Sequence, residues 1–442
     1  MKRIILCILL SLLIESELTA KTVYICRNDD LNYICKTEKT KYIIQFEHQF
    51  KDTLYVPKNC ELFFEGGHLC GPIVFYNTKL GGNVNLKGSS ISGNVHNTFF
   101  DASWLCAMDG ESDDAKSINE IINVCGNIFF PKGRYLLLSF FNPQGKIDEY
   151  FYGSVECHIG IYKNDIVLRG EEGTEMLIEK PSSGICVFSK PNQIENSVRN
   201  IVISGITFRV KNDGENFHEF AHTIKMKGVN NITIKDCVFD DFWGDAICLS
   251  HYYDTPETGE RTRNQNIKIL RNTIKGGEHY NNRNGISIGN GKNVLIKGNI
   301  IKNTSRKDMP GGIDIEPNNS AYTIDNIKII DNYIEYVKGM IGAICVVIPR
   351  NAPAHNISIL NNTIKNCSWG ISVCVSSEKS TSNFIIAGNN TDDKTVPYRF
   401  CDRGSSRNWI IKNNIWGRPC RQIIPGNIKV ENLVLKNNKK KE

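Results

Sequence analysis

An Asn followed by alternating apolar residues recurs as NIVISGITF (200–208), NITIKDCVF (231–239), NIKILRNTI (266–274), NVLIKGNII (293–301) and NIKIIDNYI (326–334). The pattern continues as NISILNNTI (356–364), NFIIAGNNT (383–391) and NWIIKNNIW (408–416), and fades at NIKVENLVL (427–435). Eight intervals separate residues 200 and 427, about 28 residues each. A period of this length, filled with short alternating strands, predicts a solenoid and not a helical repeat, because no run keeps a 3.6-residue period.

A second Asn stands six residues after the first in six of these copies. These residues are Asn272, Asn299, Asn332, Asn362, Asn389 and Asn414. Asn tolerates the left-handed backbone of a tight turn, and its amide can hydrogen-bond to the same residue one coil away. We therefore expect an internal asparagine column and a single-stranded right-handed parallel β-helix, an all-β fold.

A third strand precedes each pair, as in DAICLS (245–250), GISIGN (285–290), GIDIEP (312–317), GAICVV (342–347) and GISVCV (370–375). Aligning their inward Ile residues leaves two outward columns. The first reads Cys248, Ser287, Asp314, Cys345, Ser372, and the second reads Ser250, Gly289, Glu316, Val347, Cys374. Strands of neighbouring coils should lie roughly 4.8 Å apart.

The front of the chain is organised differently. Residues 1–20 read as a signal peptide, with Lys2 and Arg3 before an apolar run that is too short to span a bilayer. Residues 21–138 hold short strands with Gly-rich turns and then a helix that begins near Asp113, capped by Ser112, and ends at Gly126. This helix is expected to cover the open end of the solenoid, which spans 139–435 and precedes a basic tail at 436–442.

Composition narrows the class of protein. With 40% hydrophobic residues and a net charge of +6, the chain is neither disordered nor an obvious nucleic-acid binder, and no further stretch is long enough for an integral membrane segment. We expect a secreted or periplasmic protein. The 16 cysteines show no zinc spacing; Cys26 with Cys35, and Cys60 with Cys70, are candidate disulfide pairs.

The stretch MDGESDDAKSINEII…GNIFFPKGRYLL within 108–138, together with the repeats from 200 to 435, resembles the pectate-lyase superfamily of exported bacterial and tailspike-like β-helix proteins. The resemblance implies a carbohydrate substrate groove along the first strand of each coil. It does not select a reaction, because that superfamily contains lyases, hydrolases, epimerases and proteins without known activity. Some of its members are trimers, so we expect a monomer or a homotrimer.

Asp314 and Glu316 form the sharpest candidate for chemistry. They lie two residues apart on one strand, so they point to the same side at roughly 6.6 Å. Two such carboxylates can divide general-acid and general-base work. A calcium site with Asn318 and a solvated acidic spot are the alternatives, and no cofactor is otherwise required.

Asp245 opens GDAICLS, which is similar to the acidic segment of polygalacturonases, and NGISIG (284–289) is similar to their His-bearing strand. The match is incomplete, because Ala246 stands at the second acidic position and Asn284 at the His position. Asp245 is thus either a catalytic carboxylate or a residue that holds a turn beside Asn284.

Bulky loops are predicted at 251–265, 276–283 and 303–311, on three consecutive coils. They carry aromatic and basic residues that suit sugar faces and carboxylates, and we predict that these bind substrate. The residues are His251, Tyr252, His279, Tyr280, Arg283, Arg306 and Lys307. The sequence therefore predicts an exported enzyme that degrades a polysaccharide, by hydrolysis with paired carboxylates. A uronate lyase, with Lys307, Arg283 or Arg306 as base, and a noncatalytic glycan-binding protein are the alternatives.

Overall fold

The computed structural model describes most of the chain after residue 20. The described residues are 21–141, 156–189, 198–250, 263–277, 281–304, 311–317, 322–339, 342–348, 352, 354–375, 381–402, 406–418 and 430–440. They divide into two compact units, the first made of 1–107 with 120–128 and the second of 108–119 with 129–442. The predicted signal peptide lies outside the described residues. No helix among the described residues is long and apolar enough to cross a membrane.

Unit 1 is built from short strands in parallel pairs. Lys21 pairs with Thr40, Lys41 with Glu61, and Glu61 with Lys79, so each strand returns beside the last after about 20 residues. Its elements are β1 (Lys21–Ile25), α2 (Leu31–Ile34), β2 (Thr40–Ile44), β3 (Glu47–Gln49), β4 (Leu54–Tyr55), β5 (Glu61–Phe64), β6 (His68–Cys70), β7 (Pro72–Gly82), β8 (Ser90–Val95), β9 (Phe100–Asp101) and a 3-10 helix, Ala102–Trp104.

The division between the units passes through α3 (Ala115–Val124) and β11 (Ile128–Phe130). Helix α3 confirms the predicted helix, and its apolar residues Ile118, Ile121 and Ile122 are buried. Its predicted cap was wrong. The Ser112 hydroxyl lies in a strand and donates to Asp109, whereas Asp113 accepts the N–H of Ala115 at 3.1 Å. A role of α3 in closing the solenoid stays a prediction.

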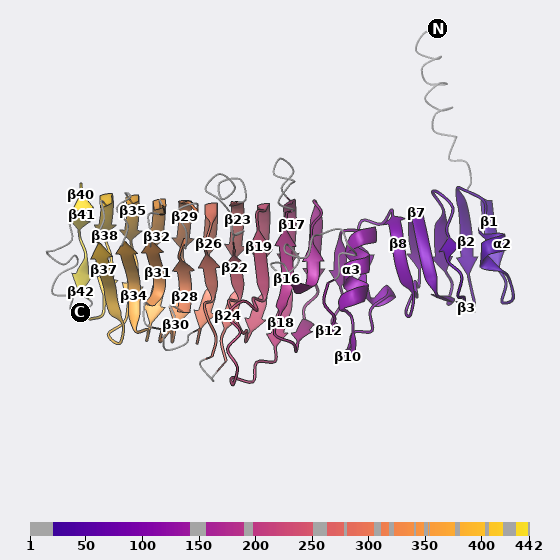
Figure 1. Cartoon of the computed structure of the whole chain (residues 1–442), viewed down its shortest axis with the longest axis horizontal. Helices are drawn as coiled ribbons and strands as arrows, with labels where there is room; N and C mark the ends of the chain where they lie inside the picture. Colours follow the sequence, from indigo (N-terminus) through magenta and orange to yellow (C-terminus); the bar gives the residue numbers. More distant parts are fainter. Residues whose placement is uncertain are drawn as a thin grey trace, which may run out of the picture. The chain divides into compact units, whose positions relative to one another are not determined.

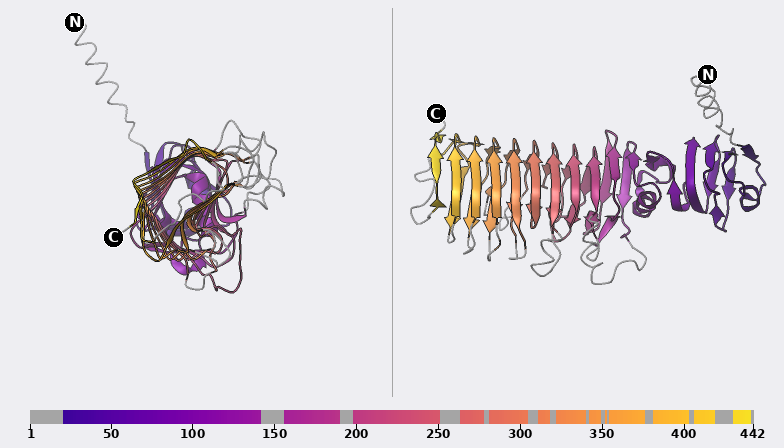
Figure 2. Two further views of the ribbon diagram at one scale, coloured as in Figure 1. Left: turned by 90° about the vertical axis from the view of Figure 1, so that its left-hand side faces the viewer. Right: turned by 90° about the horizontal axis from the view of Figure 1, so that it is seen from above.

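Unit 2 is a parallel β-helix in which every full coil contributes one strand to each of three sheets (Figures 1 and 2). Sheet I contains β13 (Cys157–Ile161), β16 (Ser183–Phe188), β19 (Ile224–Lys227), β22 (Ile247–Leu249), β25 (Ile286–Ile288), β28 (Gly311–Ile315), β31 (Gly342–Ile348), β34 (Trp369–Val375) and β37 (Val396–Asp402).

Sheet II contains β14 (Ile166–Gly170), β17 (Arg199–Ser204), β20 (Asn230–Lys235), β23 (Asn264–Leu270), β26 (Gly291–Lys297), β29 (Ile324–Ile330), β32 (Ala354–Leu360), β35 (Thr381–Ala387), β38 (Ser406–Lys412), β40 (Val430–Glu431) and β41 (Val434–Lys436). Sheet III contains β10 (Asp109–Asp113), β12 (Gly133–Leu137), β15 (Thr174–Ile178), β18 (Thr207–Val210), β21 (Val238–Asp240), β24 (Thr273–Lys275), β27 (Ile300–Lys302), β30 (Tyr333–Glu335), β33 (Thr363–Lys365), β36 (Asn390–Thr391), β39 (Ile415–Trp416) and β42 (Lys439–Lys440).

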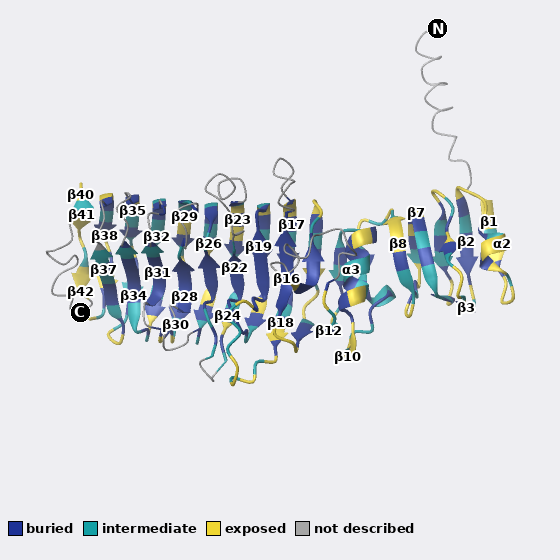
Figure 3. Ribbon diagram, in the orientation of Figure 1, coloured by how far each residue is buried: buried dark blue, intermediate teal, exposed yellow. Residues whose placement is uncertain are grey.

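The predicted register of sheet I is confirmed. Ile247 pairs with Ile286, Ile286 with Ile313, and the same row continues to Ile344 and Ile371. These residues are fully buried, and most strands of sheet I are drawn largely in the dark blue of buried residues (Figure 3). Period-two alternation fixes this register, because a slip of one residue would turn every Ile outward.

The internal asparagine column is also confirmed. Each buried amide donates to the Asn oxygen of the next coil, from Asn272 through to Asn414, and the column extends to Asn438. The left-handed residue of the turn is not this Asn but the one before it, as at Arg271 (φ 52°) and Asp331 (φ 56°). The buried Asn thereby keeps an ordinary backbone, and its amide satisfies backbone groups of the previous coil, as where Asn332 accepts the Asn299 N–H and donates to the Ile296 carbonyl.

A second, outer asparagine column was not predicted. It is formed by the first Asn of each repeat, which adopts positive φ and donates through its amide to a side-chain oxygen of the previous coil. Asn326, for example, donates to Asn293 at 2.8 Å. Asn suits this position because it tolerates the left-handed region better than other residues with a side chain.

The fourteen cysteines among the described residues are all free, so neither predicted disulfide forms. Cys26 is exposed whereas Cys35 is buried, and the buried Cys60 thiol donates to the Thr37 carbonyl at 3.3 Å. A disulfide requires two sulfur atoms at bonding distance, and none of the described cysteines has such a partner.

Candidate functional site

Three residues stack just before successive strands of sheet I. Thr223 donates to the Asp245 carbonyl at 3.0 Å, and Ala246 donates to the Asn284 carbonyl at 3.1 Å. This ladder places His222, Asp245 and Asn284 one above the other at the entrances of β19, β22 and β25. All three side chains are buried.

Asp245 is the centre of a buried charge network. Its Oδ2 lies 3.2 Å from Arg283 Nη1 and 3.2 Å from His222 Nδ1, and its Oδ1 accepts the Asn284 N–H at 3.1 Å. Arg283 also reaches Glu219 at 3.5 Å. Burial alone would raise the pKa of Asp245, but the charges of Arg283 and His222 lower it to about 2. Asp245 is therefore a fixed carboxylate at neutral pH.

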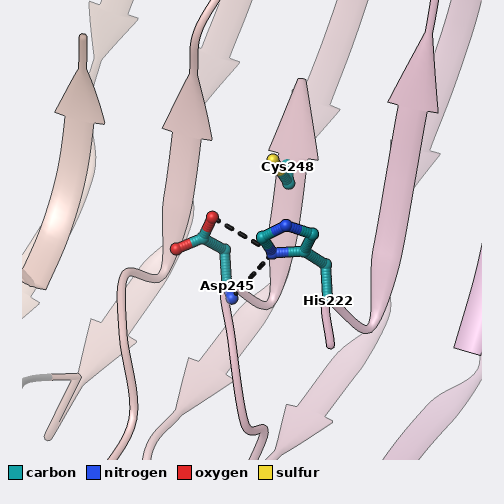
Figure 4. Close-up of side chains that lie close together, drawn as sticks. All are labelled: His222, Asp245 and Cys248. Atoms are coloured by element: carbon teal, nitrogen blue, oxygen red, sulfur yellow. Dashed lines mark hydrogen bonds and ion pairs between the residues drawn. The ribbon is translucent and has the colours of Figure 1, made fainter. Parts of the chain in front are cut away.

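His222, Asp245 and Cys248 bring an imidazole, a carboxylate and a thiol together, with their ligand atoms within 4.8 Å of one another (Figure 4). Nitrogen, oxygen and sulfur donors of this kind suit zinc. However, the Asp245 N–H already donates to His222 Nδ1 at 3.1 Å, and Arg283 supplies a cation to the carboxylate. The Arg283 guanidinium thus already supplies the positive charge beside Asp245 that a bound metal ion would supply.

Asn284 connects this network to the next carboxyl group. Its Nδ2 donates to Ser287 Oγ at 3.0 Å and to Asp314 Oδ2 at 3.3 Å, and its Oδ1 accepts the Gly311 N–H at 2.7 Å. The interpretation of Asp245 as a residue that holds the backbone beside Asn284 therefore agrees with the geometry.

Asp314 and Glu316 both have raised pKa values. Asp314 is 2% exposed, and burial, followed by repulsion from Glu316, raises its pKa well above the ordinary range. Burial also raises the pKa of Glu316, which is half-buried. Asp314 Oδ1 has no hydrogen-bond partner. The pair thus holds a proton more readily than free carboxylates do. Asp245, which contacts the same Asn284 as Asp314 does, remains ionised.

Of the predicted substrate-binding residues, the structure brings Arg283 into this cluster. The other six, His251, Tyr252, His279, Tyr280, Arg306 and Lys307, lie outside the described residues. His222, which lies just before β19, was missed, and so was Lys225 on β19. Extending the strand alignment one coil toward the N-terminus, to HTIKMK (222–227), would have found both, because Ile224 pairs with Ile247.

A pocket of about 420 Å³ lies beside the cluster. It is lined by residues of the segment before β19, among them Glu219 and Phe220, by Ser182 and Ser183 of the previous coil, and by Lys225. Glu219 belongs to both the pocket wall and the Arg283 ion pair. A ligand in this pocket would therefore lie next to the charge network.

Residues 222–415 match the protein family described as the right-handed beta helix region, so this part of the chain is a right-handed parallel β-helix. The match confirms the predicted fold and its handedness. No curated protein sequence matches the chain significantly.

Solved structures share the fold at low sequence identity. A tailspike protein of an Acinetobacter baumannii bacteriophage, described as a capsular polysaccharide depolymerase, has a TM-score of 0.50 and 13% identity, with 78% of this chain and 59% of that chain covered. A surface adhesin of Streptococcus pneumoniae has a TM-score of 0.44 and 14% identity, over 78% and 93%. The tailspike of Escherichia coli bacteriophage HK620, in complex with a pentasaccharide, has a TM-score of 0.45 and 9% identity, over 95% and 72%. The chain thus spans little more than half of the depolymerase.

Proposed function

We propose that this chain is an exported enzyme that hydrolyses a polysaccharide at the outer face of sheet I. The observation that carries the proposal is the carboxyl pair Asp314 and Glu316, whose pKa values are both raised, next to the permanently ionised Asp245. Carboxyl groups whose surroundings push their pKa values apart are typical of acid–base catalysis.

The catalytic roles of Asp314 and Glu316 follow from how deeply each carboxyl group is buried. Asp314, the more deeply buried and more strongly protonated member, donates a proton to the glycosidic oxygen. Glu316, which solvent reaches, activates the water that attacks the sugar. Alternate residues of a strand lie about 6.6 Å apart along the backbone. Carboxyl groups about 6.5–9.5 Å apart leave room for a water and invert the anomeric centre, so the proposal predicts an inverting enzyme.

A second candidate, glycan binding without cleavage, is favoured by one observation. Asp314 exposes only 2% of its surface, and a carboxyl group that no substrate can touch serves the fold and not the reaction. A lyase is the remaining enzymatic alternative, and it would use a basic side chain to remove a proton beside a uronate carboxylate.

A panel of bacterial and plant polysaccharides separates these candidates. New reducing ends without ultraviolet absorbance indicate hydrolysis, an absorbing unsaturated uronide indicates a lyase, and binding with neither indicates the third class. We expect hydrolysis that persists in a chelator, since the proposal needs no calcium. Size-exclusion chromatography with light scattering tests whether the enzyme is a monomer or a homotrimer.

Asp314→Asn and Glu316→Gln should each reduce the rate at least about 10²-fold, because each removes a proton transfer. Glu335→Gln is the matched control, since Glu335 is a carboxylate on sheet III that pairs with Lys302 at 3.3 Å. Near-full activity of both site variants, measured on the substrate that wild type cleaves, would remove the carboxyl pair from the mechanism.

A further inference from the structure

Lys225 is a buried cation at the edge of the charge network. It lies on β19 in the outward column of sheet I, between Cys186 on β16 and Cys248 on β22. It is 8% exposed and lines the pocket of about 420 Å³. Among the described residues, no carboxylate comes within ion-pair distance of its ammonium group. Lysine is almost never this buried without a partner.

Ser182 adds a second unsatisfied group to the same pocket. It is 7% exposed, and its buried Oγ has no hydrogen-bond partner. Phe220, by contrast, is 67% exposed on the pocket wall. The lining of the pocket therefore includes a buried lysine, a buried serine and an exposed aromatic ring, a composition that suits a sugar ring with one polar end.

The acidic residues of the pocket, Glu219 and Glu156, do not form an ion pair with Lys225. Glu219 is engaged by Arg283 at 3.5 Å, and Arg283 in turn pairs with Asp245. Glu156 is exposed, so water screens its charge. Lys225 is thus a cation of the pocket lining that pairs with neither of the acidic residues there.

We propose that this pocket, the Lys225 pocket, binds one sugar unit through an acidic substituent, with Lys225 and Ser182 donating hydrogen bonds to the anion and Phe220 covering the ring. The inference deepens the proposed function, since it assigns an acidic saccharide as substrate and places one of its units beside the carboxyl cluster. A carboxylate and a sulfate share the chemistry that the pocket offers, and they are separated by experiment.

The test is direct binding of small sugars to the full chain, by saturation-transfer NMR and calorimetry. The probes are glucose, glucuronate and glucose 6-sulfate, which differ only in the substituent at C6. We expect wild type to bind at least one of the two acids at least about 10-fold more tightly than glucose, more weakly as salt is added, since a charged hydrogen bond is worth about that factor. The acid that binds more tightly identifies the substituent.

Lys225→Gln should abolish this preference, Lys225→Arg should keep part of it, and Ser182→Ala should weaken it. Lys268→Gln, which removes an exposed lysine of sheet II, should change nothing. Thermal unfolding serves as the fold check: Lys225→Gln should melt at or above the wild-type temperature, because an unpaired buried charge is lost.

Equal affinity of wild type for glucose and for both acids, or no detectable binding of either acid, overturns the inference. So does an acid preference that Lys225→Gln retains. The outcome is independent of cleavage. Acid binding without cleavage of any polysaccharide would contradict the hydrolase proposal and keep the pocket, whereas cleavage by a wild type that shows no acid preference would keep the hydrolase proposal and contradict the pocket.

Discussion

Asn332 makes four hydrogen bonds through one buried side chain. Its Oδ1 accepts the N–H and the amide of Asn299, both at 2.9 Å, while its Nδ2 donates to the Ile296 carbonyl at 3.1 Å and to Asn362 at 2.9 Å. Each unsatisfied buried partner costs about 1–3 kcal/mol. We therefore expect Asn332→Leu to lower the free energy of unfolding by at least about 3 kcal/mol, measured by urea denaturation.

Asn326→Gly is the control, because it removes a bond of the outer column at a half-buried position. Glycine accepts the positive φ of 53°, so the expected loss is about 1 kcal/mol or less. A similar loss in both variants would mean that the internal column is no more important than the outer one.

The residues of the site show where prediction from the sequence succeeds and where it stops. The spacing of Asp314 and Glu316 follows from the strand period alone, and so does the internal asparagine column. The contacts of Asp245 with His222 and Arg283 do not, because these residues come from loops before three strands, and 23 and 38 residues separate them from Asp245. Only the register brings them together: Ile224 pairs with Ile247, which places His222 beside Asp245.

At the scale of the element, strand β28 depends on close contact with the next coil. A Cβ added to Gly312 would lie 2.0 Å from the carbonyl oxygen of Ala343, a backbone atom that cannot turn aside. Asp314 is two residues further along the same strand. The glycine before the paired Ile thus allows the coils to approach and keeps the carboxyl group in register.

Gly312→Ala should therefore destabilise the protein by at least about 2 kcal/mol and reduce activity, since β28 must move away from β31. Gly291→Ala is the matched substitution in sheet II, where the nearest atom is a side-chain methyl of Ile288 at 3.0 Å. Its cost should stay below about 1 kcal/mol. Circular-dichroism melting with a parallel activity assay measures both, and equal melting temperatures for the two variants would contradict this account of β28.

The stacking of coils explains why the fold was predictable and the face that carries the site was not. Each coil repeats the same inward Ile and the same Asn turn, so one correct repeat determines the rest. The outer face of sheet I has no such repetition: its column reads Lys225, Cys248, Ser287, Asp314 and Cys345. The surroundings of those residues depend on irregular segments, such as the one carrying Glu219, whose path the repeat does not fix.

For the whole molecule, the site makes stability depend on pH in two opposite directions. The pKa of Asp245 is lowered to about 2, so its contribution is present above the unfolded value near 4 and is lost as the pH falls toward 2. The pKa values of Asp314 and Glu316 are raised, so the folded state is favoured below about pH 4 and loses that advantage as the pH rises through their folded values.

Two variants separate these effects in melting curves recorded from pH 2 to pH 8. Asp314→Asn removes a carboxyl group that the fold prefers to keep protonated, so the variant should gain stability relative to wild type as the pH rises above about 4, and the gain should level off once wild-type Asp314 is ionised. Asp245→Asn leaves Arg283 without its main partner, so its deficit should be largest near neutral pH, at about 3 kcal/mol, and should shrink toward pH 2, where wild-type Asp245 is itself protonated. If the difference in stability between Asp314→Asn and wild type is constant across this pH range, Asp314 titrates like an ordinary carboxylate. It would then not be the general acid of the reaction.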